Sequence, residues 1–295
     1  MSHYTLVSKK SMAAQDDPIL ENPELASAMR EGTKVVHRAA ESSVFTKKFL
    51  KGDITKDEYG QYISSLYFIY STMERLLRSH KNHPVLQNIC FPTELEREQA
   101  LLNDLEFYYG KERLPELTSP LSMTPAVKAY VQSLEAACSV DPLLLVAHSY
   151  SRYLGDLSGG QILARRLKKH VLNLEKDDAS WDSEDGLHFY QFNNIGNHNQ
   201  FKTLYRERLD TLQVNSRTKA MIVAEAIRSF ELNIAVFDEI QAISDAKQLK
   251  PTMITDDVTK PTVSTWLANP LYVASAGIAV ASVGLIAYQR YVRNA

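Results

Sequence analysis

The sequence predicts an all-α fold in which one multi-helix domain is followed by a transmembrane helix near the C-terminal end. Several segments carry apolar residues at helical spacing, and no segment alternates as a strand next to a hairpin turn. Near the end of the chain lies a long uncharged, apolar run. The predicted helices span residues 25–40, 57–80, 93–109, 124–137, 142–170, 199–211 and 217–246.

The composition excludes several classes of protein. The chain has 295 residues, of which 44% are hydrophobic, which is enough for a sizeable core. Its 33 basic and 35 acidic residues nearly cancel, so we expect no nucleic acid as a partner. Cys90 and Cys138 lie in no CxxC or Cys/His cluster, which argues against a disulfide framework, a structural zinc and a thiolate enzyme. The first 20 residues lack an apolar run, so we expect no secretory signal.

The chain divides into five predicted parts. Residues 173–187 are polar and acidic and are expected to form a surface loop within the helical domain. Residues 247–262 contain two prolines and no apolar face, as is typical of a tether. The predicted parts are an N-terminal extension (1–24), the helical domain (25–246), a polar tether (247–265), a C-terminal transmembrane anchor (266–289) and a short basic tail (290–295).

The predicted anchor has the length and flanks of a membrane span. No residue from 261 to 289 is charged, and residues 271–288 would span about 27 Å as a helix. The alternative, a buried core helix, would normally show a polar face, and this segment shows only Ser275 and Ser282. Aromatic residues flank the run as in interfacial belts, and we therefore expect a tail anchor that leaves the helical domain in the cytosol.

A glycine-rich stretch, AHSYSRYLGDLSGGQILAR at residues 147–165, is the strongest functional signal. Gly155, Gly159 and Gly160 surround Asp156, and each glycine within a helix costs about 1 kcal/mol relative to alanine. Gly155 and Gly159 share one helix face, with Arg152 and Asp156 beside it. Close packing of two helices would also explain this spacing. The carboxylate instead favours a site for a flat ligand with a polar distal side.

A second group of polar residues lies in the first predicted helix. Arg30, Lys34, His37 and Glu41 fall on one side of this helix. A neutral imidazole binds a metal well when its other ring nitrogen is held, and Glu41 is one turn from His37. The alternative is an exposed amphipathic helix on which the histidine is merely polar.

No other histidine offers a better candidate for a metal ligand. His148 and His188 lie among apolar residues and are expected in the core. The paired ExxH helices of a di-iron site are absent from the sequence. A single histidine that faces a glycine-kinked helix fits a planar macrocycle that brings its own iron.

The chain closely resembles the heme oxygenase family from about Leu25 to Ala246. The matching motifs are TKVVHRAAE, SLYFIY, FPTELER, DLEFYYG, LLVAHSYSRYLGDLSGGQ, FKTLYRER and SFELNIAVF. A C-terminal hydrophobic anchor also belongs to the membrane-bound members. The resemblance implies heme sandwiched between a proximal helix and a kinked distal helix. Arg30 stands where lysine is more usual, and the Cys-Pro heme-regulatory motifs are missing.

The resemblance also implies a role for individual residues. His37 would be the axial ligand of the heme iron, with Glu41 as its hydrogen-bonding partner. Gly155 and Gly159 would form the distal backbone over the heme, and Asp156 would hold a distal water in a network with Tyr70, Arg152 and Asn233. The remaining heme-binding residues would be Arg30, Lys34, Lys202 and Arg206 at the propionates, and Tyr150 and Phe230 at the walls.

By this resemblance the expected reaction is oxidative cleavage of heme b at a meso carbon. The products would be biliverdin, ferrous iron and carbon monoxide, formed with O2 and with electrons from an NADPH-dependent reductase, namely cytochrome P450 reductase. The anchor would lie in the lipid bilayer of the endoplasmic reticulum. The mitochondrial outer membrane is the alternative, because Arg290 and Arg293 would place two cations on the far side of the membrane.

Two other functions fit parts of the sequence. A tail-anchored heme carrier or sensor without turnover would keep His37 but would have no use for the network around Asp156. A tail-anchored protein of the membrane-fusion type would need heptads that lead into the anchor. The proline-bearing tether argues against the second alternative.

Overall fold

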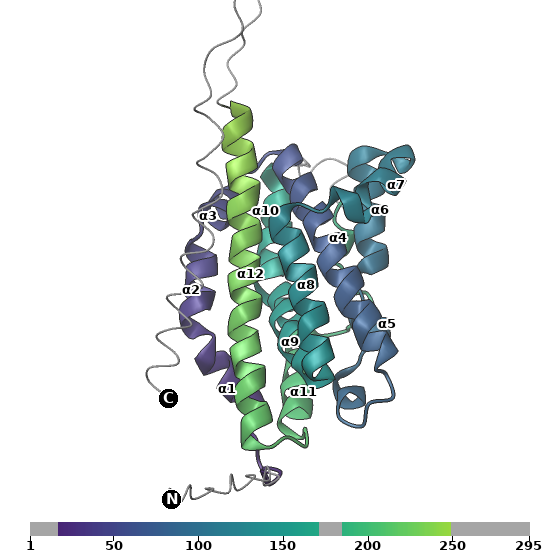
Figure 1. Cartoon of the computed structure of the whole chain (residues 1–295). Coiled ribbons are helices and arrows are strands. Elements are labelled where there is room, and N and C mark those ends of the chain that lie inside the picture. Colours follow the sequence, from purple (N-terminus) through teal and green to yellow (C-terminus); the bar gives the residue numbers. More distant parts are fainter. Residues whose placement is uncertain (1–16, 171–184, 249–295) are drawn as a thin grey trace, which may run out of the picture. The chain divides into compact units, whose positions relative to one another are not determined.

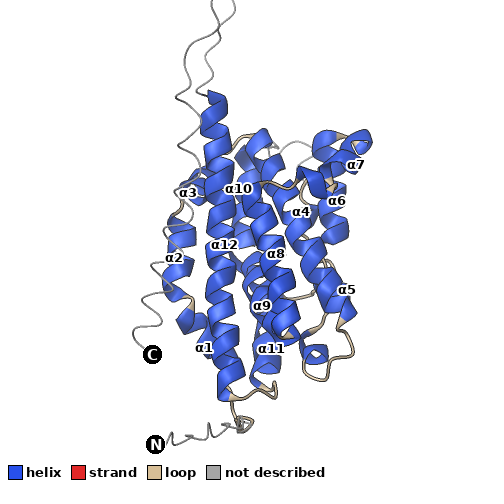
Figure 2. Cartoon of the chain, viewed as in Figure 1, coloured by secondary structure: helices blue, strands red, loops and turns tan. Residues whose placement is uncertain are grey.

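Helices make up every regular element in the part of the chain that the structure describes. The computed structural model describes residues 17–170 and 185–248, and its helices are shown in Figure 2. The one strand-like pairing within these residues is an isolated antiparallel bridge between Ile19 and Asn215. The predicted all-α class is therefore confirmed for the described residues.

The predicted membrane anchor lies outside the described residues. The same holds for the basic tail, for the first 16 residues and for most of the acidic loop and the tether. Within residues 17–170 and 185–248, no helix is both long enough and apolar enough to span a bilayer. The last described helix ends at Gln248, whereas the predicted helix ends at residue 246.

Figure 1 labels the α-helices. Short 3-10 turns lie between several of them, including η1 (Leu86–Ile89), η4 (Pro142–Leu144) and η7 (His188–Tyr190). The α-helices are α1 (Leu25–Gly32), α2 (Lys34–Ser42), α3 (Val44–Lys51), α4 (Lys56–Ser79), α5 (Pro92–Leu95), α6 (Glu98–Tyr109), α7 (Leu114–Leu117), α8 (Pro125–Val140), α9 (Leu145–Gly155), α10 (Gln161–His170), α11 (His198–Asp210) and α12 (Ser216–Gln248).

Three predicted helices are divided in the structure, and one of them, 142–170, consists of η4, α9, a π-helical turn at Asp156–Gly160 and α10. The segment 25–40 breaks at Thr33, whose hydroxyl donates a hydrogen bond to the Met29 carbonyl at 2.8 Å and bends the chain between α1 and α2. The segment 93–109 breaks into α5 and α6. The Glu74 carboxylate accepts the backbone N–H groups of Arg97 at 2.7 Å and Glu98 at 3.1 Å, and thereby satisfies the first amides of α6.

The periodicity does not reveal α3, because a helix of 8 residues is too short to show a clear repeat. Its start is nevertheless well determined, since the Ser43 hydroxyl accepts the N–H of Thr46 at 3.2 Å as a helix cap. Phe45 and Phe49, one turn apart, are both buried. The helix therefore depends on packing rather than on its own length.

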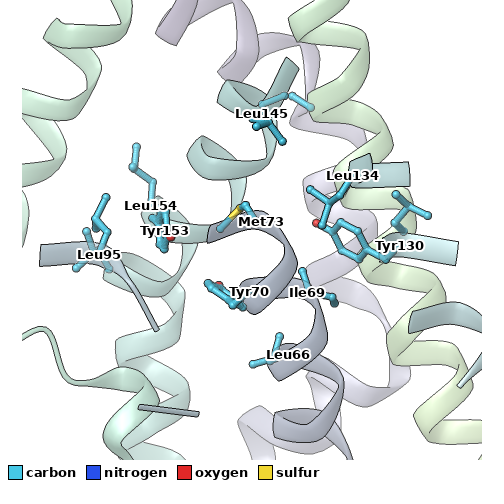
Figure 3. Packing of buried hydrophobic residues seen from close by; sticks show 14 of the residues in the cluster. Leu66, Ile69, Tyr70, Met73, Leu95, Tyr130, Leu134, Leu145, Tyr153 and Leu154 are labelled. Carbon is cyan, nitrogen blue, oxygen red and sulfur yellow. The ribbon is translucent and has the colours of Figure 1, made fainter. Parts of the chain in front are cut away.

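The central helix α4 carries much of the core. Thr55 and Glu58 form a capping box at its start, which fixes the first turn. Leu66, Ile69, Tyr70 and Met73 are fully buried where α4 packs against α6, α8 and α9. Figure 3 shows these side chains between residues of α8 and α9. Tyr70 is therefore a core residue whose side chain also carries a hydroxyl group.

The longest described helix, α12, forms the C-terminal end of the domain and packs against the helices at its N-terminal end. It has 33 residues and packs against α1, α2 and α3 as well as against α4, α8 and α9 (Figure 1). Helix α2, which carries His37, and helix α9, which leads into the glycine-rich stretch, thus share α12 as a neighbour. Side chains of α12 can therefore reach both predicted halves of the site.

One buried ion pair joins α3 to α4. The Glu58 carboxylate, only 2% exposed, accepts hydrogen bonds from Lys48 and from the backbone N–H of Thr55. Burial alone would raise the pKa of Glu58, but the bonds from Lys48, Ser244 and Thr55 and the Lys48 charge outweigh it and lower the pKa to about 2. The ionised carboxylate is therefore the stable form in the folded chain.

We predict that Glu58→Gln removes up to about 3 kcal/mol of folding free energy at pH 7. The folded pKa lies below that of the unfolded chain, so the stabilisation is present above about pH 4.5 and is lost as the pH falls toward 2. Urea unfolding at several pH values measures the difference between the wild type and the variant, which should shrink over this range. Glu135→Gln, which breaks the exposed pair with Arg75, should change stability by less than about 1 kcal/mol. A Glu58 effect as small as this one would contradict the assignment.

Candidate active site

The glycine-rich stretch forms a kinked helix with a bare face. Helix α9 ends at Gly155, a single π-helical turn follows at Asp156–Gly160, and α10 continues from Gln161. Such π-turns widen a helix and often occur at functional sites. A Cβ placed on Gly155 or Gly159 would meet no atom within 4 Å, and both residues are exposed. No described helix packs on these two glycines, so helix–helix contact does not explain them.

The third glycine has a different role. A Cβ on Gly160 would lie 3.5 Å from the ring of Tyr190 and 3.6 Å from the Cβ of Asp156. Gly160 is buried, and it lets the phenol ring approach the backbone of the π-turn. Of the glycines in this stretch, Gly155 and Gly159 thus present open backbone, and Gly160 permits internal packing.

Asp156 is the centre of a buried polar network. Its side chain is 5% exposed and accepts a hydrogen bond from the hydroxyl of Tyr70. Arg152 Nε donates to the Tyr70 hydroxyl at 3.3 Å, and Arg152 Nη1 donates to Asn233 Oδ1 at 2.5 Å. The structure therefore brings together the four residues that the resemblance placed in one network, from α4, α9, the π-turn and α12.

The environment of Asp156 shifts the pKa of its carboxyl toward neutral pH. Burial raises the pKa of Asp156 to about 6, although the Arg152 charge, the bond from Tyr70 and the Arg97 charge act in the opposite direction. Burial and the neighbouring carboxylate raise the pKa of Tyr70 well above its usual value, so its hydroxyl keeps its proton. At pH 7 Asp156 is mostly an ionised acceptor that is able to take up a proton close to this pH.

His37 lies on α2, with the Glu41 carboxylate beside one ring nitrogen at a distance longer than a hydrogen bond. Glu41 Oε1 is 3.6 Å from His37 Nδ1, and the ring leans against Phe230 with 5.4 Å between centroids. The His37 side chain is 53% exposed. No described residue hydrogen-bonds the other ring nitrogen, which leaves that nitrogen available as a ligand.

Helix α12 links the His37 and Asp156 groups through two residues. Phe230 contacts the His37 ring, and Asn233 accepts from Arg152 in the network of Asp156. Residues three apart lie on one face of a helix, so a single stripe of α12 serves both groups.

Cationic residues gather beside the π-turn. Lys202 on α11 donates to the Ser158 hydroxyl at 3.0 Å, and burial and the nearby Arg206 charge lower its pKa. The charges of Arg206 and Arg30 act on Tyr150, whose pKa burial raises. The structure thus groups these three cations with Tyr150. Lys34 instead pairs with Glu31 at 3.5 Å, and no recorded contact joins it to the other cations.

Sequence reasoning overlooked several buried residues near the network. Arg97 and Tyr62 interact electrostatically with Asp156, and Tyr153 donates to the Glu74 carboxylate at 3.1 Å. In the sequence Arg97 stands among other charged residues, and Tyr62 and Tyr153 stand in helical stretches, so no pattern singled them out. Burial also raises the pKa of Glu74, to about 7, in spite of its backbone hydrogen bonds.

Two further histidines, His148 and His188, have structural partners. His148 is fully buried, as expected, and its Nε2 lies 2.7 Å from Glu225 Oε1. His188 is less buried than expected, because it lies at a turn and its Nδ1 bonds Asp104 at 2.9 Å. Within the described ranges, no cluster of three or more His, Cys, Asp or Glu side chains could hold a metal ion.

Comparisons with known proteins agree on one family. The family model described as heme oxygenase matches residues 23–239. Heme oxygenase 1 of Synechocystis sp. is 42% identical over 217 residues, which cover 74% of this chain and 85% of the relative. Human heme oxygenase 1 is 38% identical over 231 residues, covering 78% and 76%.

Solved structures give the same result. The crystal structure of the Synechocystis heme oxygenase-1 in complex with heme superposes with a TM-score of 0.67 at 40% identity, over 76% of this chain and 98% of that one. The heme oxygenase from Leptospira interrogans superposes with a TM-score of 0.65 at 42% identity, over 73% and 99%.

The bare face of the π-turn gives a prediction about stability. Gly155→Ala should raise the free energy of unfolding of the ligand-free chain by about 0.5–1 kcal/mol, since the added Cβ meets no atom within 4 Å and alanine favours the helix. Gly60→Ala on α4 is the matched control, because there a Cβ would lie 2.2 Å from the Tyr109 hydroxyl and should destabilise the chain. Urea unfolding measures both variants. Loss of stability in Gly155→Ala would show that this glycine has a structural role.

Proposed function

Because the chain belongs to the heme oxygenase family and is a heme-degrading enzyme, we propose that it cleaves heme b at a meso carbon to biliverdin, ferrous iron and carbon monoxide. The observation that carries this proposal is the buried carboxyl of Asp156, which lies between two open glycines and is held by Tyr70. A site that only stores heme has no need for such a group. We therefore favour turnover over the carrier or sensor alternative.

The residues present fit a heme molecule as substrate. The open backbone of Gly155 and Gly159 would let a flat ring approach closely, and His37 has one nitrogen beside Glu41 and the other without a described partner. Phe230 would form part of the wall on the His37 side. Bound heme supplies the iron that activates O2 and the ring carbon that is oxidised.

On the distal side, Asp156 would hold a water molecule and control its proton. Tyr70 donates to the carboxylate, and a carboxylate has about four acceptor positions in all, so others remain for water. With a pKa of about 6, Asp156 accepts and returns a proton at little cost near neutral pH. Arg152 donates a hydrogen bond to the Tyr70 hydroxyl, and Asn233 accepts one from Arg152.

The cations beside the π-turn would orient the substrate. Lys202, Arg206 and Arg30 present positive charge near Tyr150, and the propionates of heme are negatively charged. Several cations along one edge would fix which meso carbon lies below Asp156. Lys34 would join them only by exchanging its pairing with Glu31.

We also propose O2 and an NADPH-dependent cytochrome P450 reductase as the co-substrate and the electron source, on the basis of family resemblance. The uncharged segment 266–289 supports insertion into the lipid bilayer. We propose the endoplasmic reticulum, with the catalytic domain in the cytosol, as its membrane.

We predict that Asp156→Ala still binds heme with an unchanged histidine-ligated absorption spectrum but forms biliverdin at least about 100-fold more slowly, as is usual for loss of a positioned proton-transfer group. Added hemin, reductant and O2, followed by absorption spectroscopy, measure both properties. Biliverdin formation within about twofold of the wild type would assign Asp156 a structural role only.

His37→Ala is the companion variant, because it separates iron ligation from proton transfer. It should lose the histidine-ligated spectrum and turnover together, and added imidazole should restore part of both. An unchanged spectrum in this variant would exclude His37 as the ligand.

The membrane assignment has its own prediction. A chain that ends at Lys260 should be soluble and should keep full heme turnover, because every site residue lies between Arg30 and Asn233. A fluorescent protein fused to residues 247–295 should label the endoplasmic reticulum. Labelling of mitochondria would favour the alternative membrane, and a diffuse signal would exclude the anchor.

A further inference from the structure

A cavity of about 220 Å3 lies between the C-terminal half of α4, the turn η1, α5 and α9. Its walls include Leu77 of α4, Ile89 of η1, Leu95 of α5 and Tyr153 of α9. Figure 3 labels two of these residues, Leu95 and Tyr153. None of the described residues that we expect to bind heme or to bond Asp156 lines this cavity. The cavity is therefore built from a separate set of side chains.

The walls of the cavity are mainly apolar, and its buried polar groups already have partners. Phe91 and Tyr153 provide aromatic surface. The Tyr153 hydroxyl donates to Glu74, whose carboxylate also accepts two backbone N–H groups. The hydroxyl of Ser149 bonds that of Tyr205. A buried water molecule needs about two to four polar partners, so this cavity suits an apolar occupant better than water.

The charges at the mouth of the cavity largely compensate one another. Arg78, whose side chain is 45% exposed, pairs with Glu96 at 3.0 Å and with Glu98 at 2.8 Å. Lys81 is the other cation of the lining and is exposed. An exposed lysine contributes little to an ion pair, because water screens its charge. A ligand can therefore enter from solvent beside these residues, and a neutral ligand fits better than an ionic one.

The volume and the walls of the cavity indicate the size and shape of the ligand. A cavity of about 150 Å3 lined by Leu, Ile and Phe binds benzene, and the present cavity is larger. A flat ring can pack favourably against the rings of Phe91 and Tyr153. We propose that this cavity binds a small neutral aromatic molecule of one or two rings, at a site separate from that of heme. Binding removes apolar surface of both the walls and the ligand from water.

Cys90 provides a direct probe of occupancy. It lines the cavity and is partly exposed, whereas Cys138 is 7% exposed and lies outside the lining. These are the two cysteines of the chain, so in a Cys138→Ser variant only Cys90 can be alkylated. Burial and the Glu96 charge raise the pKa of the Cys90 thiol, so alkylation is best measured at about pH 9, where more thiolate is present.

Indole, a neutral two-ring molecule, is the probe ligand. In the heme-free Cys138→Ser chain, indole should slow alkylation of Cys90 in a saturable manner, by about tenfold at about ten times its Kd. Adding Leu77→Trp fills the cavity with a larger side chain and should abolish this protection. Leu121→Trp is the matched control, because Leu121 is 96% exposed and lies outside the lining, and it should keep the protection. Absence of saturable protection, or equal protection in the two tryptophan variants, would overturn the proposed site.

Thermal unfolding gives a second measurement of the same binding. Indole should raise the melting temperature of the heme-free wild type, because it binds the folded chain, and should leave that of Leu77→Trp unchanged. If Leu77→Trp fails to fold, Ile89→Phe narrows the cavity from another wall and should weaken the protection of Cys90 severalfold. Full protection in a folded Ile89→Phe chain would contradict binding in this cavity.

Two further compounds test the class of ligand and the separation from heme. Indole-3-carboxylate should protect Cys90 less well than indole, because its charge loses water and gains only Lys81 at the mouth. Tighter binding of this anion would exclude a neutral ligand class. Hemin in equimolar amount should leave the protection by indole unchanged, and loss of protection would assign the cavity to the heme site instead. None of these measurements requires heme turnover, so their outcome is independent of the proposed function.

Discussion

The burial of the Asp156 carboxyl beside the Arg152 guanidinium is the constraint on which the rest of the site depends. Removing a charge from water costs several kcal/mol unless a partner and further hydrogen bonds compensate. Tyr70 from α4 bonds Asp156, and Asn233 from α12 bonds Arg152, so helices distant in sequence must meet at one point. The core around Tyr70 in Figure 3 holds this point in place. Packing and polar chemistry are therefore inseparable here.

Two further buried carboxyl groups, those of Glu74 and Asp104, position chain segments around Asp156. Glu74 receives the first amides of α6 and the hydroxyl of Tyr153, whose ring lies 5.9 Å from that of Tyr70. Asp104 holds the turn η7 through three hydrogen bonds and so positions Tyr190 against Gly160. Both carboxyls determine where chain segments begin or turn, and both place aromatic rings next to Asp156. The two carboxyls therefore influence the chemistry of Asp156 by positioning these rings.

The site also contains features that oppose stability. The open glycines weaken a helix, a buried carboxyl with a raised pKa disfavours its own charge, and His37 with Phe230 leaves aromatic surface partly exposed. Each of these features has a use when a flat, iron-bearing ring lies against the glycine backbone. Natural sequences break local rules mainly at functional sites, and here the exceptions gather on α2, the π-turn and one stripe of α12.

The sequence by itself determined the helical class, the long helices and the two motifs around His37 and Asp156, because these depend on residues within one or two turns of each other. It also indicated the partners Tyr70, Arg152 and Asn233 through family resemblance, and the structure brings them together. Only the tertiary structure decided where the predicted helices break, since Glu74 interrupts the segment 93–109 from 23 residues away. It alone revealed that the buried carboxyls of Glu74 and Asp104 hold the start of α6 and the turn η7. Contacts between separate elements have no common sequence pattern, because burial and mutual distance arise only when the helices pack.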